Sequence, residues 1–136
     1  MSRYCLDTSA YSRFQRGDPA LVDLIDRAEW IGMPTVTLGE LRTGFLLGSR
    51  TAQNEAELGE FLASPVVTEL TVDGEVSRHY AEMVVDLRRA GTPVPTNDIW
   101  IAATAARAGA LVLTADTHFE RITRVGSVIV GGRRVQ

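Results

Sequence analysis

Short apolar runs alternate with amphipathic helical segments along this chain, and that alternation is the feature that most restricts its fold. Strands are expected at residues 3–7, 30–33, 66–70, 110–114 and 127–130. Between them, helices are expected at 8–14, 18–29, 37–48, 51–64, 73–91 and 98–109. Strands that alternate with helices form mostly parallel sheets covered on both faces. Without repeats or linkers, the pattern predicts a single α/β domain over residues 1–136 with a central, mostly parallel sheet.

The composition narrows the class of protein. No apolar run approaches the ~20 residues that a membrane-spanning helix needs, so we expect no membrane association. A single cysteine, Cys5, rules out an internal disulfide and favours a reducing cytoplasm. All fourteen cationic side chains are arginines, and the net charge is −3. The chain therefore lacks a general basic field for nucleic acid and has no lysine for a P-loop or a Schiff base.

Four carboxylates occupy positions where a parallel sheet forms ligand sites. Asp7 ends the first expected strand, and Asp116 closely follows a late one. Asp98 lies in the first turn of the helix before that late strand, and Glu40 lies in the first turn of an earlier helix. Ligand sites of such sheets form at the carboxyl ends of the strands. If the two strands are neighbours, the four side chains converge on one sheet edge.

Each of these carboxylates also has a purely structural interpretation. Asp7 can cap the helix after it, and Asp116 can form a turn. Asp98 can complement a helix dipole, with Thr96 or Asn97 as the N-cap. Glu40 completes a capping box with Thr37, three residues earlier. The structural interpretations do not explain why all four acids gather at one edge.

A bound cation accounts for such a gathering, because crowded carboxylates raise one another's pKa and cannot all ionise unaided. Mg²⁺ and Mn²⁺ take oxygen ligands and leave positions for water and substrate phosphates. Short polar side chains beside the acids can orient ligands or a water: Thr8, Ser9, Asn97 and Thr114. The chemistry that this site predicts is metal-assisted hydrolysis of a phosphodiester. His118, two residues after Asp116, is expected at the surface.

Three segments, in this order, carry a family resemblance: "CLDTSAY", "TLGELRTG" and "PTNDIWIAATAARAGALVLTADTHF". The chain resembles the PIN-domain ribonucleases, and within them the VapC-type toxins of toxin–antitoxin pairs. This resemblance implies a PIN-like three-layer α/β/α sandwich that binds Mg²⁺ or Mn²⁺ and cleaves RNA. It makes Asp7 and Asp98 the firmest metal ligands, with Asp116 completing the site. Glu40 would act as a ligand or through water, and Thr114 would support the site.

The resemblance also implies partners. VapC-like proteins form homodimers and are inhibited by a small cognate antitoxin, so DNA would be contacted only through that antitoxin. The antitoxin's C-terminal segment lies near the site and can point a basic side chain into the acidic pocket. Candidates for its groove are Leu46, Leu47, Phe61 and Leu62, although core packing is the favoured interpretation of each. The terminal segment 131–136 is a basic tail that can touch RNA or a partner.

Two phosphoryl-transfer classes are excluded by simple absences. Haloacid-dehalogenase-like phosphatases and receiver domains need paired early acids and a lysine, whereas position 9 is Ser9 and the chain has no lysine. A non-enzymatic alternative stays open: a PIN-like binding module that acts with its antitoxin in operon autoregulation. The choice of RNA, the number of metal ions and the preference between Mg²⁺ and Mn²⁺ also stay open.

Overall fold

The computed structural model describes residues 2–131, and at their centre is a five-stranded sheet in the order β3-β2-β1-β4-β5. The strands are β1 (Arg3–Leu6), β2 (Trp30–Pro34), β3 (Val67–Leu70), β4 (Leu111–Thr114) and β5 (Ser127–Ile129). Every pairing is parallel, and Cys5 aligns with Gly32 on one side and Val112 on the other. Because β1 and β4 are direct neighbours, the acids that follow them, Asp7 and Asp116, lie at the same edge.

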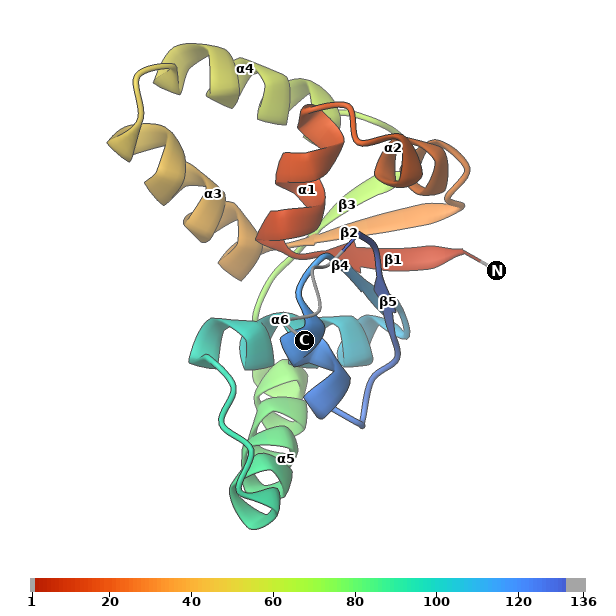
Figure 1. Cartoon of the computed structure of the whole chain (residues 1–136), viewed down its shortest axis with the longest axis vertical. Coiled ribbons are helices and arrows are strands. Elements are labelled where there is room, and N and C mark those ends of the chain that lie inside the picture. Colours follow the sequence, from red (N-terminus) through yellow and green to blue (C-terminus); the bar gives the residue numbers. More distant parts are fainter. Residues whose placement is uncertain (1, 132–136) are drawn as a thin grey trace.

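Helices cover both faces of this sheet, as Figure 1 shows. One layer consists of α1 (Thr8–Gln15), α2 (Pro19–Asp26), α3 (Thr35–Leu47) and α4 (Thr51–Leu62). The other consists of α5 (Gly74–Ala90), α6 (Thr96–Ala108) and the 3₁₀-helix η1 (Thr117–Arg121). The predicted α/β class and the three-layer α/β/α arrangement are confirmed.

The central strands are apolar throughout because both of their faces are buried. Successive side chains of a strand point to opposite faces. In β1, Cys5 therefore packs into the core under α5 and α6, and Leu6 packs into the core under α1–α4. In β4, Val112 and Leu113 divide in the same way. Burial raises the pKa of Cys5 to about 12, so this residue is an inert core thiol.

The helix that carries Asp98, α6, lies directly against the sheet. Its buried positions are mostly small: Ala102, Ala103 and Ala105 are fully enclosed, with Ile101 beside them. Alanine is a strong helix former, and its short side chain lets the helix axis approach the strands closely. On the outer side of α6, Trp100 stacks on Tyr80 of α5, with ring centroids 3.7 Å apart. Packing on both sides holds the N-terminus of α6 in place at the edge of the sheet.

Two predicted helix starts are wrong. Helix α3 begins at Thr35, after Pro34 as N-cap, so Thr37 lies inside the helix and forms no capping box with Glu40. The Thr37 hydroxyl instead donates to the carbonyl oxygen of Leu6 at 2.9 Å, which ties α3 to the end of β1. Because α3 begins two residues earlier than predicted, Glu40 lies in its second turn and not in its first.

Helix α6 likewise begins at Thr96, after Pro95, with no side-chain cap. Neither Thr96 nor Asn97 is the predicted N-cap, which leaves the Asn97 side chain available for another contact. Asp98 is in the first turn of the helix, as predicted.

Among the described helices, none has both the length and the apolar character to cross a membrane. The predicted basic tail, 131–136, falls outside the described residues from position 132 onward.

Candidate metal centre

Asp7 is the most enclosed of the four predicted acids, with only 5% of its surface exposed. It caps α1, because its Oδ1 accepts from the backbone N–H of Ala10 at 2.9 Å. The hydroxyls of Ser9 and Thr114 also donate to its carboxylate, at 2.8 Å and 2.6 Å. Burial raises the pKa of Asp7, the three hydrogen bonds oppose that rise, and the negative charge of Asp116 adds to it. The structural interpretation of Asp7 as a helix cap is therefore confirmed.

The same two hydroxyls connect Asp7 to the end of β4. Ser9 Oγ accepts from the backbone N–H of Ala115, and Thr114 Oγ1 accepts from that of Asp116, both at 2.9 Å. Asp116 in turn caps η1, since its Oδ1 accepts from the backbone N–H of His118 at 2.8 Å. The loop after β4 is thus held to the start of α1 by side chains from both elements.

Glu40 approaches from α3 and is held by the remaining two predicted supporting residues. The Thr8 hydroxyl donates to its Oε1 at 2.7 Å, and the Asn97 amide donates to its Oε2 at 3.4 Å. All four short polar side chains named from the sequence therefore bind either a predicted acid or its backbone. Their part in metal binding stays a prediction.

Asp98 shows most directly that the acids lie near one another. Burial raises its pKa from 3.8 to about 6, and repulsion from three neighbouring carboxylates adds to the effect. In order of influence, these neighbours are Asp116, Asp7 and Glu40. The structure thus brings the four predicted acids into one electrostatic group at the carboxyl edge of the sheet.

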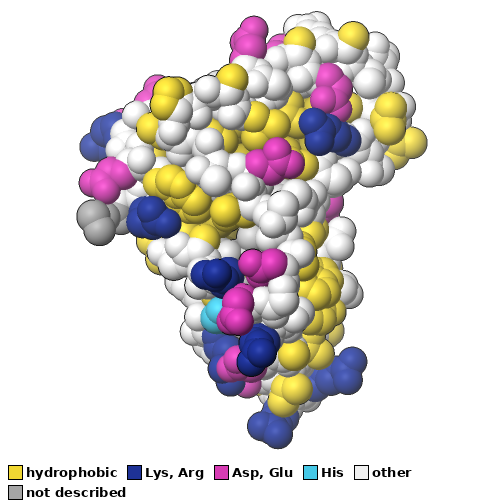
Figure 2. Space-filling model, turned by 180° about the vertical axis from the view of Figure 1, so that it is seen from behind, with side chains coloured by type: hydrophobic (Ala, Val, Ile, Leu, Met, Phe, Trp, Pro, Cys, Tyr) yellow, Lys and Arg dark blue, Asp and Glu magenta, His cyan; other side chains and the backbone are white. Residues whose placement is uncertain are grey.

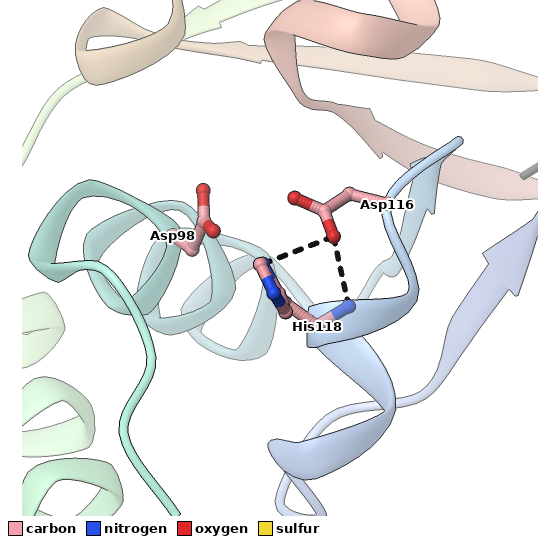
Figure 3. A group of neighbouring side chains, drawn as sticks. All are labelled: Asp98, Asp116 and His118. Carbon is pink, nitrogen blue, oxygen red and sulfur yellow. Dashed lines mark hydrogen bonds and ion pairs between the residues drawn. The ribbon is translucent and has the colours of Figure 1, made fainter. Parts of the chain in front are cut away.

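His118 lies closer to this group than the sequence suggested. One possible ligand atom from each of Asp98, Asp116 and His118 falls within 4.8 Å of the others, and Figure 3 shows the three side chains facing a common space. Although 43% of the His118 side chain is exposed, its Nδ1 is shielded from solvent. The surface prediction therefore missed its proximity to the acids; the Asp-x-His spacing is the signal that could have indicated it.

A family model described as "PIN domain" matches residues 4–125. Ribonuclease VapC4 from Mycobacterium tuberculosis is 35% identical over 130 residues, which cover 94% of this chain and 97% of that relative. The chain belongs to the PIN-domain family and, within it, to the VapC ribonucleases. The predicted family and class of enzyme are confirmed.

Solved structures with the same fold come from VapBC toxin–antitoxin systems. VapBC-5 from Mycobacterium tuberculosis aligns with a TM-score of 0.75 and 32% identity, over 96% of this chain and 100% of that one. VapBC2 from Rickettsia felis, solved with a DNA fragment from its promoter, aligns with a TM-score of 0.83 and 21% identity over 94% and 98% of the two chains. The second likeness supports the fold alone.

The donor groups of this VapC-family chain suit a divalent ion. Two carboxylates and an imidazole meet in Asp98, Asp116 and His118, with Asp7 and Glu40 as further negative charge nearby. His118 Nδ1 is buried without a hydrogen-bond partner among the described residues. A buried imidazole nitrogen without a hydrogen-bond partner, beside carboxylates that repel one another, is a position that suits a cation.

Outside the acidic group, the predicted partner surface divides into two parts. Leu46 and Leu47, at the end of α3, are 75% and 85% exposed, so the core-packing interpretation is wrong for both. Phe61 and Leu62 are partly buried against the core under α1–α4, as core packing predicts. The exposed pair therefore remains available as an apolar contact.

Charges of both signs are interspersed over the face seen in Figure 2, where arginines lie beside carboxylates instead of forming one continuous basic area. Arg42 is paired with Glu55 at 3.0 Å. This distribution agrees with the overall net charge of −3.

Proposed function

We propose that this protein is an Mg²⁺- or Mn²⁺-dependent endoribonuclease that acts as the toxin of a toxin–antitoxin pair. Membership of the VapC ribonucleases supports RNA as the substrate. The observation that carries the metal dependence is the position of Asp98, whose pKa is raised to about 6 by burial and by the three other acids. A divalent ion bound among them would offset the repulsion between these side chains.

In this proposal Asp7 and Asp98 are the firmest ligands of the ion, from the end of β1 and the first turn of α6, and Asp116 completes the site. The ion supplies positive charge against the charge that develops on the phosphate, and it acidifies water. Thr114 and Ser9 donate to the two oxygens of Asp7, which favours its ionised form and orients the carboxylate. Because both hydroxyls also accept backbone N–H groups, they are poorly able to rotate away.

Glu40 is the acid that we expect to act through water. Its Oε1 is fixed by Thr8 at 2.7 Å, whereas the contact from Asn97 to its Oε2 is long, at 3.4 Å. Oε2 is therefore available to accept a proton from an attacking water. The water oxygen forms a bond to phosphorus, the bond from phosphorus to the leaving oxygen breaks, and that oxygen takes up a proton.

The proposed partners are a small antitoxin and a second copy of this chain. VapBC-5, at 32% identity, is described as a member of a toxin–antitoxin family, which supports an antitoxin for this chain. The exposed Leu46 and Leu47 offer an apolar contact for it, and the acidic group would attract a basic side chain. Contact with DNA is proposed only through that antitoxin.

The test compares the parent protein with Asp98→Asn on total RNA in Mg²⁺, Mn²⁺ or EDTA. Asp26→Asn, on the exposed surface of α2, is the matched control. Discrete cleavage by the parent and by the control is expected, with loss in EDTA and in Asp98→Asn, and mapping the new ends identifies the substrate. Cleavage that persists in EDTA would refute the metal dependence. If the parent neither cleaves RNA nor binds Mn²⁺ in a calorimeter, the binding module is the better description.

A further inference from the structure

The least explained group in the site is the imidazole of His118. Asp116 Oδ1 lies 3.2 Å from His118 Nδ1, but that nitrogen has no hydrogen-bond partner among residues 2–131. The same oxygen already accepts the backbone N–H of His118 at 2.8 Å. The two atoms attract each other when the imidazole is protonated. In the neutral tautomer with a lone pair on Nδ1 they repel each other, and a cation bound to both removes that repulsion.

The local chain geometry holds the imidazole in this position. Asp116, two residues before His118, caps the first turn of η1, and Phe119, immediately after His118, is completely buried under the sheet. Between a capped turn and a buried anchor, the backbone of His118 has little freedom. The ring is therefore directed toward Asp98 and Asp116 by the fold, as Figure 3 shows.

The distances fit adjacent ligands of one ion. In an octahedral site with bonds of about 2.1 Å, neighbouring ligand atoms lie about 3.0 Å apart and opposite ones about 4.2 Å apart. The 3.2 Å between Asp116 Oδ1 and His118 Nδ1 is close to the first value. The possible ligand atoms of Asp98, Asp116 and His118 all lie within 4.8 Å of one another, which allows for the larger spacing of opposite ligands.

We propose that His118 Nδ1 is a direct nitrogen ligand of the divalent ion, together with carboxylate oxygens of Asp98 and Asp116. This inference rests on the proposed function. Mg²⁺ prefers oxygen ligands, whereas imidazole favours first-row transition metals. This ligand therefore biases the centre toward a transition-metal ion and away from Mg²⁺. The all-carboxylate site expected from the sequence lacks that bias.

The experiment uses Mn²⁺ as the probe, on purified full-length protein without RNA. Pulsed electron paramagnetic resonance of bound Mn²⁺ detects a directly coordinated nitrogen, and ¹⁵N-labelled histidine identifies its source. The variants are His118→Asn, which retains a short polar side chain, and His79→Asn on α5, which changes the chain's other histidine. Calorimetry gives the affinities of each protein for Mn²⁺ and Mg²⁺.

The parent and His79→Asn are expected to show the histidine nitrogen coupling, and His118→Asn is expected to lose it. Mn²⁺ affinity should fall on the order of 10- to 100-fold in His118→Asn, with a smaller change for Mg²⁺ because an amide oxygen can replace the nitrogen.

If Mn²⁺ binds the parent but not Asp98→Asn, and the parent shows no histidine nitrogen coupling, His118 is not a ligand of the ion. The proposed metal-dependent function would still stand in that case. Coupling that persists in His118→Asn would also show that His118 is not the ligand. If the parent binds no Mn²⁺, the inference and the proposed metal centre fail together.

Discussion

Replacing Asp98 with asparagine should make the metal-free protein more stable at neutral pH, although the same change abolishes the proposed activity. The pKa of Asp98 is raised from 3.8 to about 6, by burial first and then by neighbouring acids. The folded protein therefore holds the proton of Asp98 more tightly than the unfolded chain does. The stabilisation that protonated Asp98 gives to the folded state is fully present below pH 4 and is lost as the pH rises through about 6. Asparagine cannot ionise, so the variant should not undergo this loss.

The size of the effect follows from the pKa difference. A rise from 3.8 to about 6 corresponds to about 3 kcal/mol at 1.36 kcal/mol per pKa unit. Asp98 is only partly buried, and solvent screening reduces this figure to roughly 1.5 kcal/mol. Loss of a negative charge in the first turn of α6 costs about 0.5 kcal/mol through the helix dipole. The repulsion outweighs the dipole, and the net gain of about 1 kcal/mol corresponds to a rise in Tm of roughly 3–5 °C.

Calorimetric unfolding between pH 4 and pH 8 in EDTA measures this difference. The Tm of Asp98→Asn should exceed that of the parent above pH 6 and converge with it near pH 4, whereas Asp26→Asn, in the last turn of α2, should show at most the small rise that follows from removing a negative charge at a helix C-terminus. Adding Mn²⁺ should stabilise the parent and leave Asp98→Asn nearly unchanged. An asparagine variant that is less stable than the parent in EDTA at pH 7.5 would refute the electrostatic reasoning.

Three further predictions concern the support of the site, each measured by urea unfolding. Thr114→Val should lower the free energy of unfolding by about 1–3 kcal/mol, because Asp7 loses a hydrogen-bond donor and the backbone N–H of Asp116 loses its acceptor. An unchanged free energy of unfolding would contradict this double role of the Thr114 hydroxyl. Phe119→Ala should lower the free energy of unfolding by about 3–5 kcal/mol and also weaken Mn²⁺ binding, since it removes the buried anchor of η1. An Mn²⁺ affinity equal to the parent's would show that this anchor does not position the metal site. Gly32→Ala should cost about 1–3 kcal/mol by overpacking, because its Cβ would lie 2.6 Å from Leu70 Cδ1; a stability equal to the parent's would show that this neighbour moves freely aside.

The sequence predicted those parts of the site that depend on strand ends. Asp7 and Asp116 could be placed at one edge because apolar runs buried on both faces indicate parallel strands, whose carboxyl ends coincide. Asp98 followed from the helix that precedes β4. These inferences need only local patterns and the general geometry of parallel sheets.

The contacts that decide the details are long-range, and the sequence did not reveal them. Thr37 matched a local capping box, but its hydroxyl bonds to Leu6, which is 31 residues earlier in the chain. His118 resembled an ordinary surface residue because its proximity to Asp98 depends on how η1 packs beside α6. Local propensity cannot rank a nearby hydrogen bond against a distant one when both satisfy the same side chain.

The four acids are also unequally replaceable over evolution. Asp7 holds the first turn of α1 and Asp116 holds that of η1, whereas Asp98 lies within α6 and caps nothing. A gene copy can escape selection for RNA cleavage and yet still bind the antitoxin. Selection would then continue to act on the stability of its fold, because an unfolded chain cannot bind. In such a lineage, substitutions should accumulate first at Asp98 and only later at Asp7, so the order of loss among decayed relatives would record which acids also support the fold.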